Sequence, residues 1–157
     1  MTVQLLLTIL RDKKSIQIKG IQKDVVGLAR YSTINNMKSE YIKVAFTDGS
    51  GMYFPIDEEV AFYFEKKLGT AFEVSDIDIN GVNKDLKWNG IDFRLVNGND
   101  YQYVKELYVG DIHGIEGEVR FSDYESDDGG GLSLGWNMYE HKRDDVYAVP
   151  LDLSELE

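Results

Sequence analysis

The sequence predicts an all-β fold, or a mainly β fold with one short helix. Apolar and polar residues alternate along most of the chain with the period of two that half-buried strands show. Asn-Gly and Asp-Gly pairs interrupt the alternating runs, and such pairs favour tight hairpin turns. Ten Tyr, seven Phe and two Trp residues also tilt the composition toward strands. We therefore expect antiparallel hairpins that form a sandwich or a partly open barrel.

The N-terminal residues 2–12 are compatible with two interpretations. Leu6, Ile9 and Leu10 have helical spacing, and Thr2 has the chemistry of a helix cap. The basic residues that follow suit the C-terminal end of a helix. A strand over the same residues remains open. The apolar run in this segment lacks the flanks of a signal peptide and is too short to span a bilayer, so we expect it in the core.

The rest of the chain divides into predicted strands separated by polar turns. The expected strands are 15–20, 25–32, 41–46, 52–54, 60–64, 86–88, 91–95, 101–108, 118–124, 132–139 and 146–149. One turn of helix is an alternative for 60–64, because three acidic residues precede it. Asp48-Gly49 and Asn89-Gly90 predict hairpins, and the polar residues 97–100 predict a further turn.

The chain length of 157 residues fits a single domain, 1–157. Within it, residues 27–32 and 117–122 share Gly, Arg and Ser at equivalent places, and each segment leads into a polar turn and an apolar strand. This similarity suggests two related halves, 15–80 and 84–150. Chance similarity is the alternative interpretation, since only two copies are present.

The charge and the cysteine content exclude several classes of function. The formal net charge is −11, which argues against nucleic acid as a partner and disfavours anionic lipid surfaces. The sequence has no Cys, so disulfides, thiolate metal sites and Cys nucleophiles are absent. We expect a cytoplasmic protein without an integral membrane segment, whose partner is another protein.

Catalytic and cofactor motifs are missing from the sequence. There is no Gly-x-Ser-x-Gly, no phosphate-binding glycine loop and no dinucleotide fingerprint. The acidic stretch 123–131 invites a calcium interpretation, but Asp128 and Leu134 stand where an EF-hand needs Gly and Glu. We therefore predict a solvated hairpin loop there, no catalytic residue and no cofactor.

Histidine gives weak candidates for metal binding or acid–base chemistry. His113 and His141 are the two histidines of the chain, and Asp111 and Glu116 lie close to His113 in sequence. A metal site or a His–Asp pair is one interpretation. The spacing matches no established metal motif, so a surface or loop role is the simpler one.

Three arginines and two tryptophans are candidate binding residues. Arg30, Arg94 and Arg120 each lie within an apolar strand context. If they converge, their planar guanidinium groups suit an anion or carboxylate. The alternative is that each faces solvent and pairs with neighbouring acids. Trp88 and Trp136 belong to a set of aromatic residues that line either a ligand pocket or the core.

The C-terminal half carries a series of short motifs in a fixed order. They are Trp88-Asn89-Gly90-Ile91-Asp92-Phe93, Tyr103-Val104-Lys105, Ile115-Glu116-Gly117-Glu118-Val119, Ser122-Asp123-Tyr124-Glu125 and Leu132-Ser133-Leu134. This order resembles the bacterial domain-of-unknown-function family numbered 4178, over residues 18–149. Trp136 departs from the resemblance, which places Glu there. The resemblance implies a bacterial all-β domain without established activity. Some members of that family appear beside membrane-stress proteins, which implies a structural or adaptor role.

These observations lead to three hypotheses about function. The first is a non-enzymatic interaction or adaptor module with an acidic surface, linked to membrane stress through the resemblance. The second is a β domain that binds a small molecule or lipid through one or more of the three arginines in a cavity. The third is a metal-dependent hydrolase that uses His113, Asp111 and Glu116.

Overall fold

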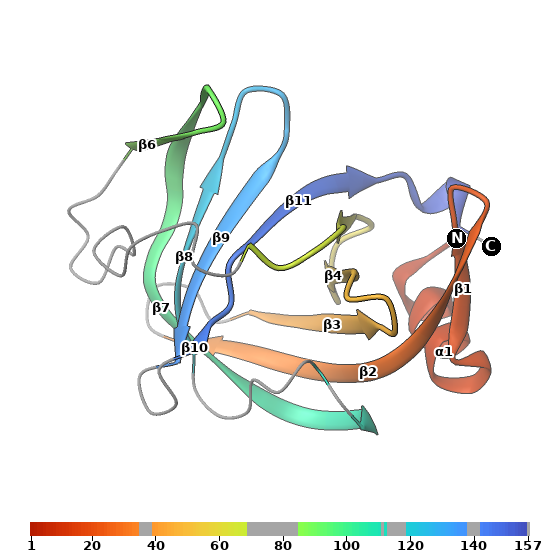
Figure 1. The fold of residues 1–157 in the computed structure, drawn as a ribbon. Helices are drawn as coiled ribbons and strands as arrows, with labels where there is room; N and C mark the ends of the chain where they lie inside the picture. Colours follow the sequence, from red (N-terminus) through yellow and green to blue (C-terminus); the bar gives the residue numbers. More distant parts are fainter. Residues whose placement is uncertain (35–38, 69–84, 111, 113–118, 138–141, 157) are drawn as a thin grey trace.

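The computed structural model is a closed antiparallel β-barrel with one helix packed against its strands (Figure 1). It describes residues 1–34, 39–68, 85–110, 112, 119–137 and 142–156. In chain order the elements are α1 (Val3–Lys13), β1 (Ser15–Ile18), β2 (Ile21–Ile34), β3 (Glu40–Phe46), β4 (Gly51–Pro55), β5 (Ala61–Phe64), β6 (Asp85–Trp88), β7 (Ile91–Gly110), β8 (Val119–Glu125), β9 (Gly131–Asn137), β10 (Lys142–Arg143), β11 (Val146–Leu151) and the short 3₁₀ helix η2 (Leu153–Glu155). The predicted mainly β fold with one short helix is confirmed.

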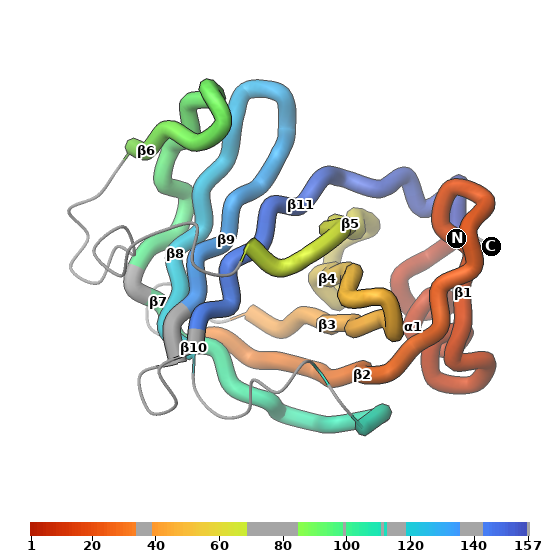
Figure 2. Tube along the Cα trace, in the orientation of Figure 1, coloured from red at the N-terminus to blue at the C-terminus, as the bar shows by residue number. Residues whose placement is uncertain are grey.

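The barrel has eight strands in the order β2, β3, β4, β5, β11, β9, β8 and β7. All neighbouring pairs are antiparallel, and the ring closes because β2 also pairs with β7 from Gly27 opposite Gly110 to Ile34 opposite Tyr101. Outside the ring, β1 pairs with β2, β6 with β7 and β10 with β9. Figure 2 traces this path along the chain. We expected a sandwich or a partly open barrel, and the structure is a barrel whose ring of strands is closed.

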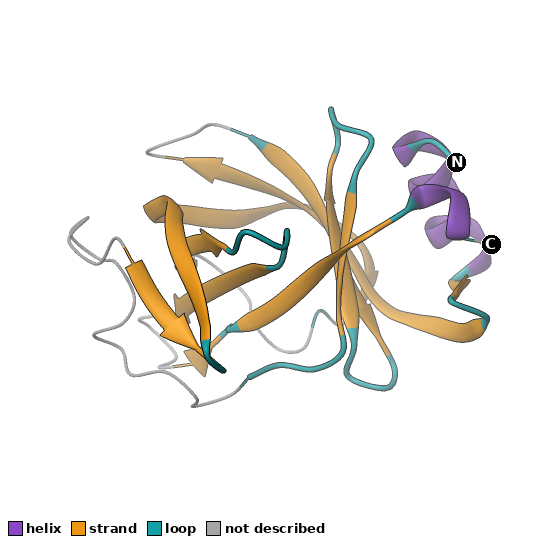
Figure 3. Cartoon of the chain, turned by 90° about the horizontal axis from the view of Figure 1, so that it is seen from above, coloured by secondary structure: helices purple, strands orange, loops and turns teal. Residues whose placement is uncertain are grey.

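The ambiguous N-terminal segment is a helix. Thr2 caps it, because its Oγ1 accepts a hydrogen bond from the backbone N–H of Leu5 at 3.1 Å. Val3, Leu6 and Leu10 are buried on one face. Lys14 then ends the helix in the left-handed conformation, at φ 54°. Figure 3 shows α1 at the end of the molecule where both chain termini lie.

Replacing the helix cap tests how much α1 contributes to stability. We expect Thr2→Ala to lower the free energy of unfolding by about 1 kcal/mol, because the N–H of Leu5 loses its acceptor. Thr2→Ser keeps the hydroxyl and is the matched control. Urea unfolding curves measure the difference, and equal midpoints for the two variants would show that the cap is dispensable.

Alternation along β3 separates two environments. Ile42 and Phe46 are fully buried and belong to one apolar cluster with Leu6 and Leu10 of α1. The opposite face of the same strand carries Lys43, which lines the interior of the barrel. Both faces of this strand are therefore covered, one by the helix and the other by the barrel itself.

The turn predicted at residues 97–100 is wrong, because these residues lie within β7, a continuous strand of 20 residues. The register to β8 shifts between Leu95 and Asn97 and again between Asn97 and Asp100. The buried carboxylate of Asp100 accepts the backbone N–H of Tyr101 at 2.8 Å and a hydrogen bond from the amide of Asn97 at 3.3 Å. These polar residues therefore make β7 irregular in its middle, between the part that pairs with β6 and the part that pairs with β2.

The C-terminal residues pack against the helix, because Leu153 and Leu156 are buried in the same apolar cluster as α1. The proposed halves, 15–80 and 84–150, stay a prediction. Residues 27–32 lie in β2, and the described part of the second segment, 119–122, lies in β8.

Candidate functional site

The interior of the barrel contains a cavity of about 310 Å³. One lining residue from each barrel strand is Tyr31, Lys43, Tyr53, Phe64, Val146, Ser133, Asp123 and Gln102. Val96 lines the cavity and is 57% exposed, so the cavity reaches the surface beside β7. The volume lies at the lower end of the range for small-molecule sites.

Aromatic side chains form much of the wall. Tyr31 of β2 stacks on Tyr41 of β3 with ring centroids 5.6 Å apart. Tyr53 of β4 stacks on Phe62 of β5 at 5.2 Å. All four residues line the cavity, because they occupy inward positions on four consecutive strands. The wall therefore presents flat apolar surfaces together with the hydroxyl groups of three tyrosines.

Two lysines meet one carboxylate in this wall. Lys43 Nζ lies 3.1 Å from Asp144 Oδ2, and Lys67 donates a hydrogen bond to Asp144 Oδ1. Lys67 follows β5 and forms a bridge to Val146, whereas the backbone N–H of Asp144 bonds the carbonyl of Gly135 at 3.0 Å. Backbone pairing thus fixes all three groups. We call Lys43, Lys67 and Asp144 the lysine–aspartate cluster.

The lysine–aspartate cluster faces the cavity. The side chains of Lys43 and Lys67 keep 26% and 29% of their accessible surface, while Asp144 keeps 7%. Burial lowers the pKa of Lys43 to about 8 and that of Lys67 to about 7. The charges of Asp123 near Lys43 and of Asp145 near Lys67 oppose this effect, whereas the charge of Lys43 lowers the pKa of Lys67 further. Lys43 also lies over the ring of Tyr31, 4.9 Å from its centroid.

Asp123 adds a second carboxyl group to the cavity wall. Burial raises its pKa to about 6, while a hydrogen bond with Ser133 and the charge of Lys43 act in the opposite direction.

The loop predicted at residues 123–131 is shorter than expected, because Asp123 belongs to β8. The turn itself is closed by hydrogen bonds from Ser126 N to Gly130 O at 3.0 Å and from Gly130 N to Asp128 at 3.0 Å.

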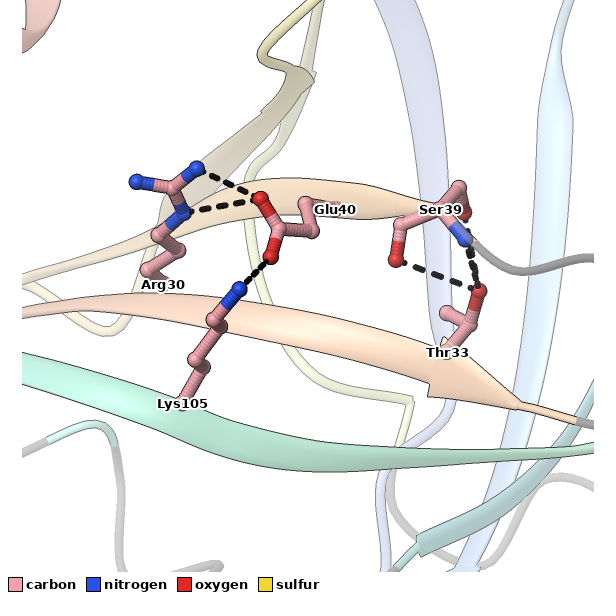
Figure 4. Close-up of polar contacts among 5 residues, drawn as sticks. All are labelled: Arg30, Thr33, Ser39, Glu40 and Lys105. Atoms are coloured by element: carbon pink, nitrogen blue, oxygen red, sulfur yellow. Dashed lines mark hydrogen bonds and ion pairs between the residues drawn. The ribbon is translucent and has the colours of Figure 1, made fainter.

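The three candidate arginines do not line the cavity. Arg30 pairs with Glu40 at 2.5 Å, and Lys105 binds the other oxygen of the same carboxylate, as Figure 4 shows. Glu40 precedes the cavity residue Tyr41 on β3, so this group lies on the opposite face. Figure 4 also shows Thr33 bonded to Ser39, with 3.0 Å between Ser39 N and Thr33 Oγ1.

Arg94, Arg120 and Trp88 also lie apart from the cavity lining. Arg94 is exposed and pairs with Glu125 and Asp127. Arg120 lies 4.7 Å from the ring centroid of Tyr101. Trp88 packs against Phe93 and Tyr147 in a separate apolar cluster. The backbone of Trp136 belongs to β9, but its side chain is outside the described part of the structure.

The candidate metal residues His113, Asp111 and Glu116 lie outside the described residues, as does His141. Within the part of the chain that is described, no group of three or more acidic or histidine side chains is arranged to hold a metal ion. No helix among these residues is long and apolar enough to cross a membrane.

Comparison of the chain with protein-family models, with curated proteins and with solved structures finds no match. The resemblance described above therefore stays an expectation, and the cavity is interpreted from its own chemistry. Sequence analysis missed Lys43, Lys67 and Asp144 as site residues. The available signal was Lys43 itself, a single charge in the apolar run 41–46.

Proposed function

We propose that this protein is a binding protein for a small, partly apolar organic molecule that occupies the barrel interior. The observation that carries the proposal is the cavity of about 310 Å³ that all eight barrel strands line. Closed eight-stranded barrels have room inside for side chains or for one small ligand. Here the inward positions leave a space with aromatic walls and a few charged groups, as small-molecule sites do.

A cavity-filling substitution tests this proposal. Ser133 lies on β9 and lines the cavity, so Ser133→Phe places a ring where the ligand would lie. We expect the neutral fluorescent probe phenylnaphthylamine to bind the native protein, and to bind the variant at least about tenfold more weakly. Fluorescence titration measures both affinities.

Gln17→Phe, on the exposed face of β1, is the matched control, because it adds the same ring outside the barrel. Circular dichroism establishes that both variants are folded. Probe binding that is absent from the native protein, or equal in Ser133→Phe and Gln17→Phe, would contradict a ligand site in the barrel.

The interaction module remains a separate proposal that rests on the net charge of −11. Its partner would present basic residues, and the association would weaken with added salt. The hydrolase hypothesis rests on residues outside the described structure and stays a prediction. Neither draws support from the cavity, so ligand binding is the function that the geometry favours.

A further inference from the structure

The charged groups of the cavity distinguish between ligand classes. Each lysine ammonium group has three N–H donors, and Asp144 accepts one from Lys43 and one from Lys67. Both side chains also line the cavity, so their remaining donors border it. The cavity wall is therefore rich in donors at the lysine–aspartate cluster.

The tyrosines of the wall add hydroxyl donors. Tyr31, Tyr41 and Tyr53 line the cavity, and burial raises the pKa of Tyr41 well above its ordinary value, so its hydroxyl stays protonated. The three carboxylates of the lining already have partners, because Asp144 is shared by two lysines, Asp123 is bonded to Ser133 and Glu125 pairs with Arg94. A ligand that supplies acceptor atoms and a negative charge satisfies this wall better than a neutral or cationic one.

The rest of the lining determines the body of the ligand. Apolar side chains form the remaining wall that concerns the ligand: Phe62, Phe64, Met52, Val44 and Val146. They provide no hydrogen-bond partner for a second polar group on the ligand. The volume of about 310 Å³ lies at the lower end of the range for small-molecule sites. Such a site suits one charged head and a short apolar body.

We infer that the barrel binds an organic carboxylate, with the carboxylate on Lys43 and Lys67 and the apolar body against the aromatic wall. The inference rests on the proposed function. It differs from the arginine clamp that was one interpretation of the sequence, because Lys43 on β3 and Lys67 after β5 supply the positive charge. Asp144 holds the two ammonium groups together and leaves donors on each for the ligand.

Matched ligands and single substitutions test the inference. Decanoate, decanol and decylamine have similar bodies and differ in the head group, and calorimetry at pH 6, below the pKa of Lys67 of about 7, gives the three affinities. We expect the native protein to prefer decanoate over decanol by about tenfold, as one charge-assisted hydrogen bond provides. Lys43→Met and Lys67→Met should each abolish this preference while decanol affinity stays within about twofold.

Both variants retain one lysine beside Asp144, so no unpaired carboxylate is created. Lys43→Arg keeps the positive charge and should keep the preference for decanoate. Equal affinity for decanoate and decanol, or tighter binding of decylamine, would overturn the inference and leave the proposed function in place. Absence of binding by all three ligands and by phenylnaphthylamine would overturn both.

Discussion

Asp145→Ala should reduce the free energy of unfolding by about 3–5 kcal/mol, because it removes one partner of a buried ion pair. Asp145 is fully buried, and its Oδ2 lies 2.8 Å from Arg143 Nη2, whose side chain is 9% exposed. Its Oδ1 also accepts the backbone N–H of Gly135 at 3.0 Å. Burial raises the pKa of Asp145 to about 6, so the carboxyl is ionised at neutral pH.

Urea unfolding at neutral pH measures the loss. Asp92→Ala is the matched control, since Asp92 is 87% exposed and lies 3.8 Å from Lys87, and it should leave the stability unchanged. Asp145→Asn keeps an acceptor oxygen for the N–H of Gly135 but not the charge. Its free energy of unfolding should lie between those of Asp145→Ala and Asp92→Ala. If Asp145→Ala were as stable as Asp92→Ala, the pair would not hold β10 and β11 in place as described.

Most barrel strands were predictable from the sequence, but the continuity of β7 and the closure of the barrel were not. Alternation and turn residues identified most strands, since both depend on neighbours in the chain. Closure depends on β2 meeting β7, which lies about 70 residues further along the chain. The register shifts near Asn97 resemble a turn in sequence, because the same polar residues satisfy the backbone in both structures.

The candidate site was hidden for a related reason. Alternation shows that Lys43 and Ile42 point to opposite sides of β3, but not which side is the barrel interior. Both sides are buried here, so hydrophobicity does not decide between them. Lys43 and Asp144 are 101 positions apart, and no local spacing connects them. The arginines drew attention as isolated charges, yet each lies outside the cavity lining.

Asp144→Asn should destabilise the protein by about 2–3 kcal/mol at neutral pH, because Lys43 and Lys67 lose their shared counter-charge. This free-energy cost lies at the lower end of the range for breaking a buried ion pair, since both lysine side chains keep about a quarter of their accessible surface. Asp127→Asn is the control, because Asp127 is 93% exposed beside Arg94. Thermal and urea unfolding measure the difference between the two variants.

The loss of stability in Asp144→Asn should depend on pH in a defined direction. The folded-state pKa values of Lys43 and Lys67, about 8 and 7, lie below the ordinary value of 10.5. The unfolded chain therefore binds more protons, and stability from these groups rises as pH rises through this window. Asp123, with a pKa of about 6, and the neighbouring tyrosines, Tyr31 and Tyr41, with raised pKa values, titrate outside it.

Without Asp144 the two lysines lose a carboxylate in direct contact with both ammonium groups, so we expect their pKa values to fall further. The stability gap between the native protein and Asp144→Asn should then narrow as pH rises from about 7 to about 9, where the lysines are neutral in both proteins. Decanoate should stabilise the variant more than the native protein, because its carboxylate takes the place of the lost one. A gap that is constant across this range would show that Asp144 acts through packing rather than charge. The lysine–aspartate cluster would then not be the charged centre that binds a carboxylate.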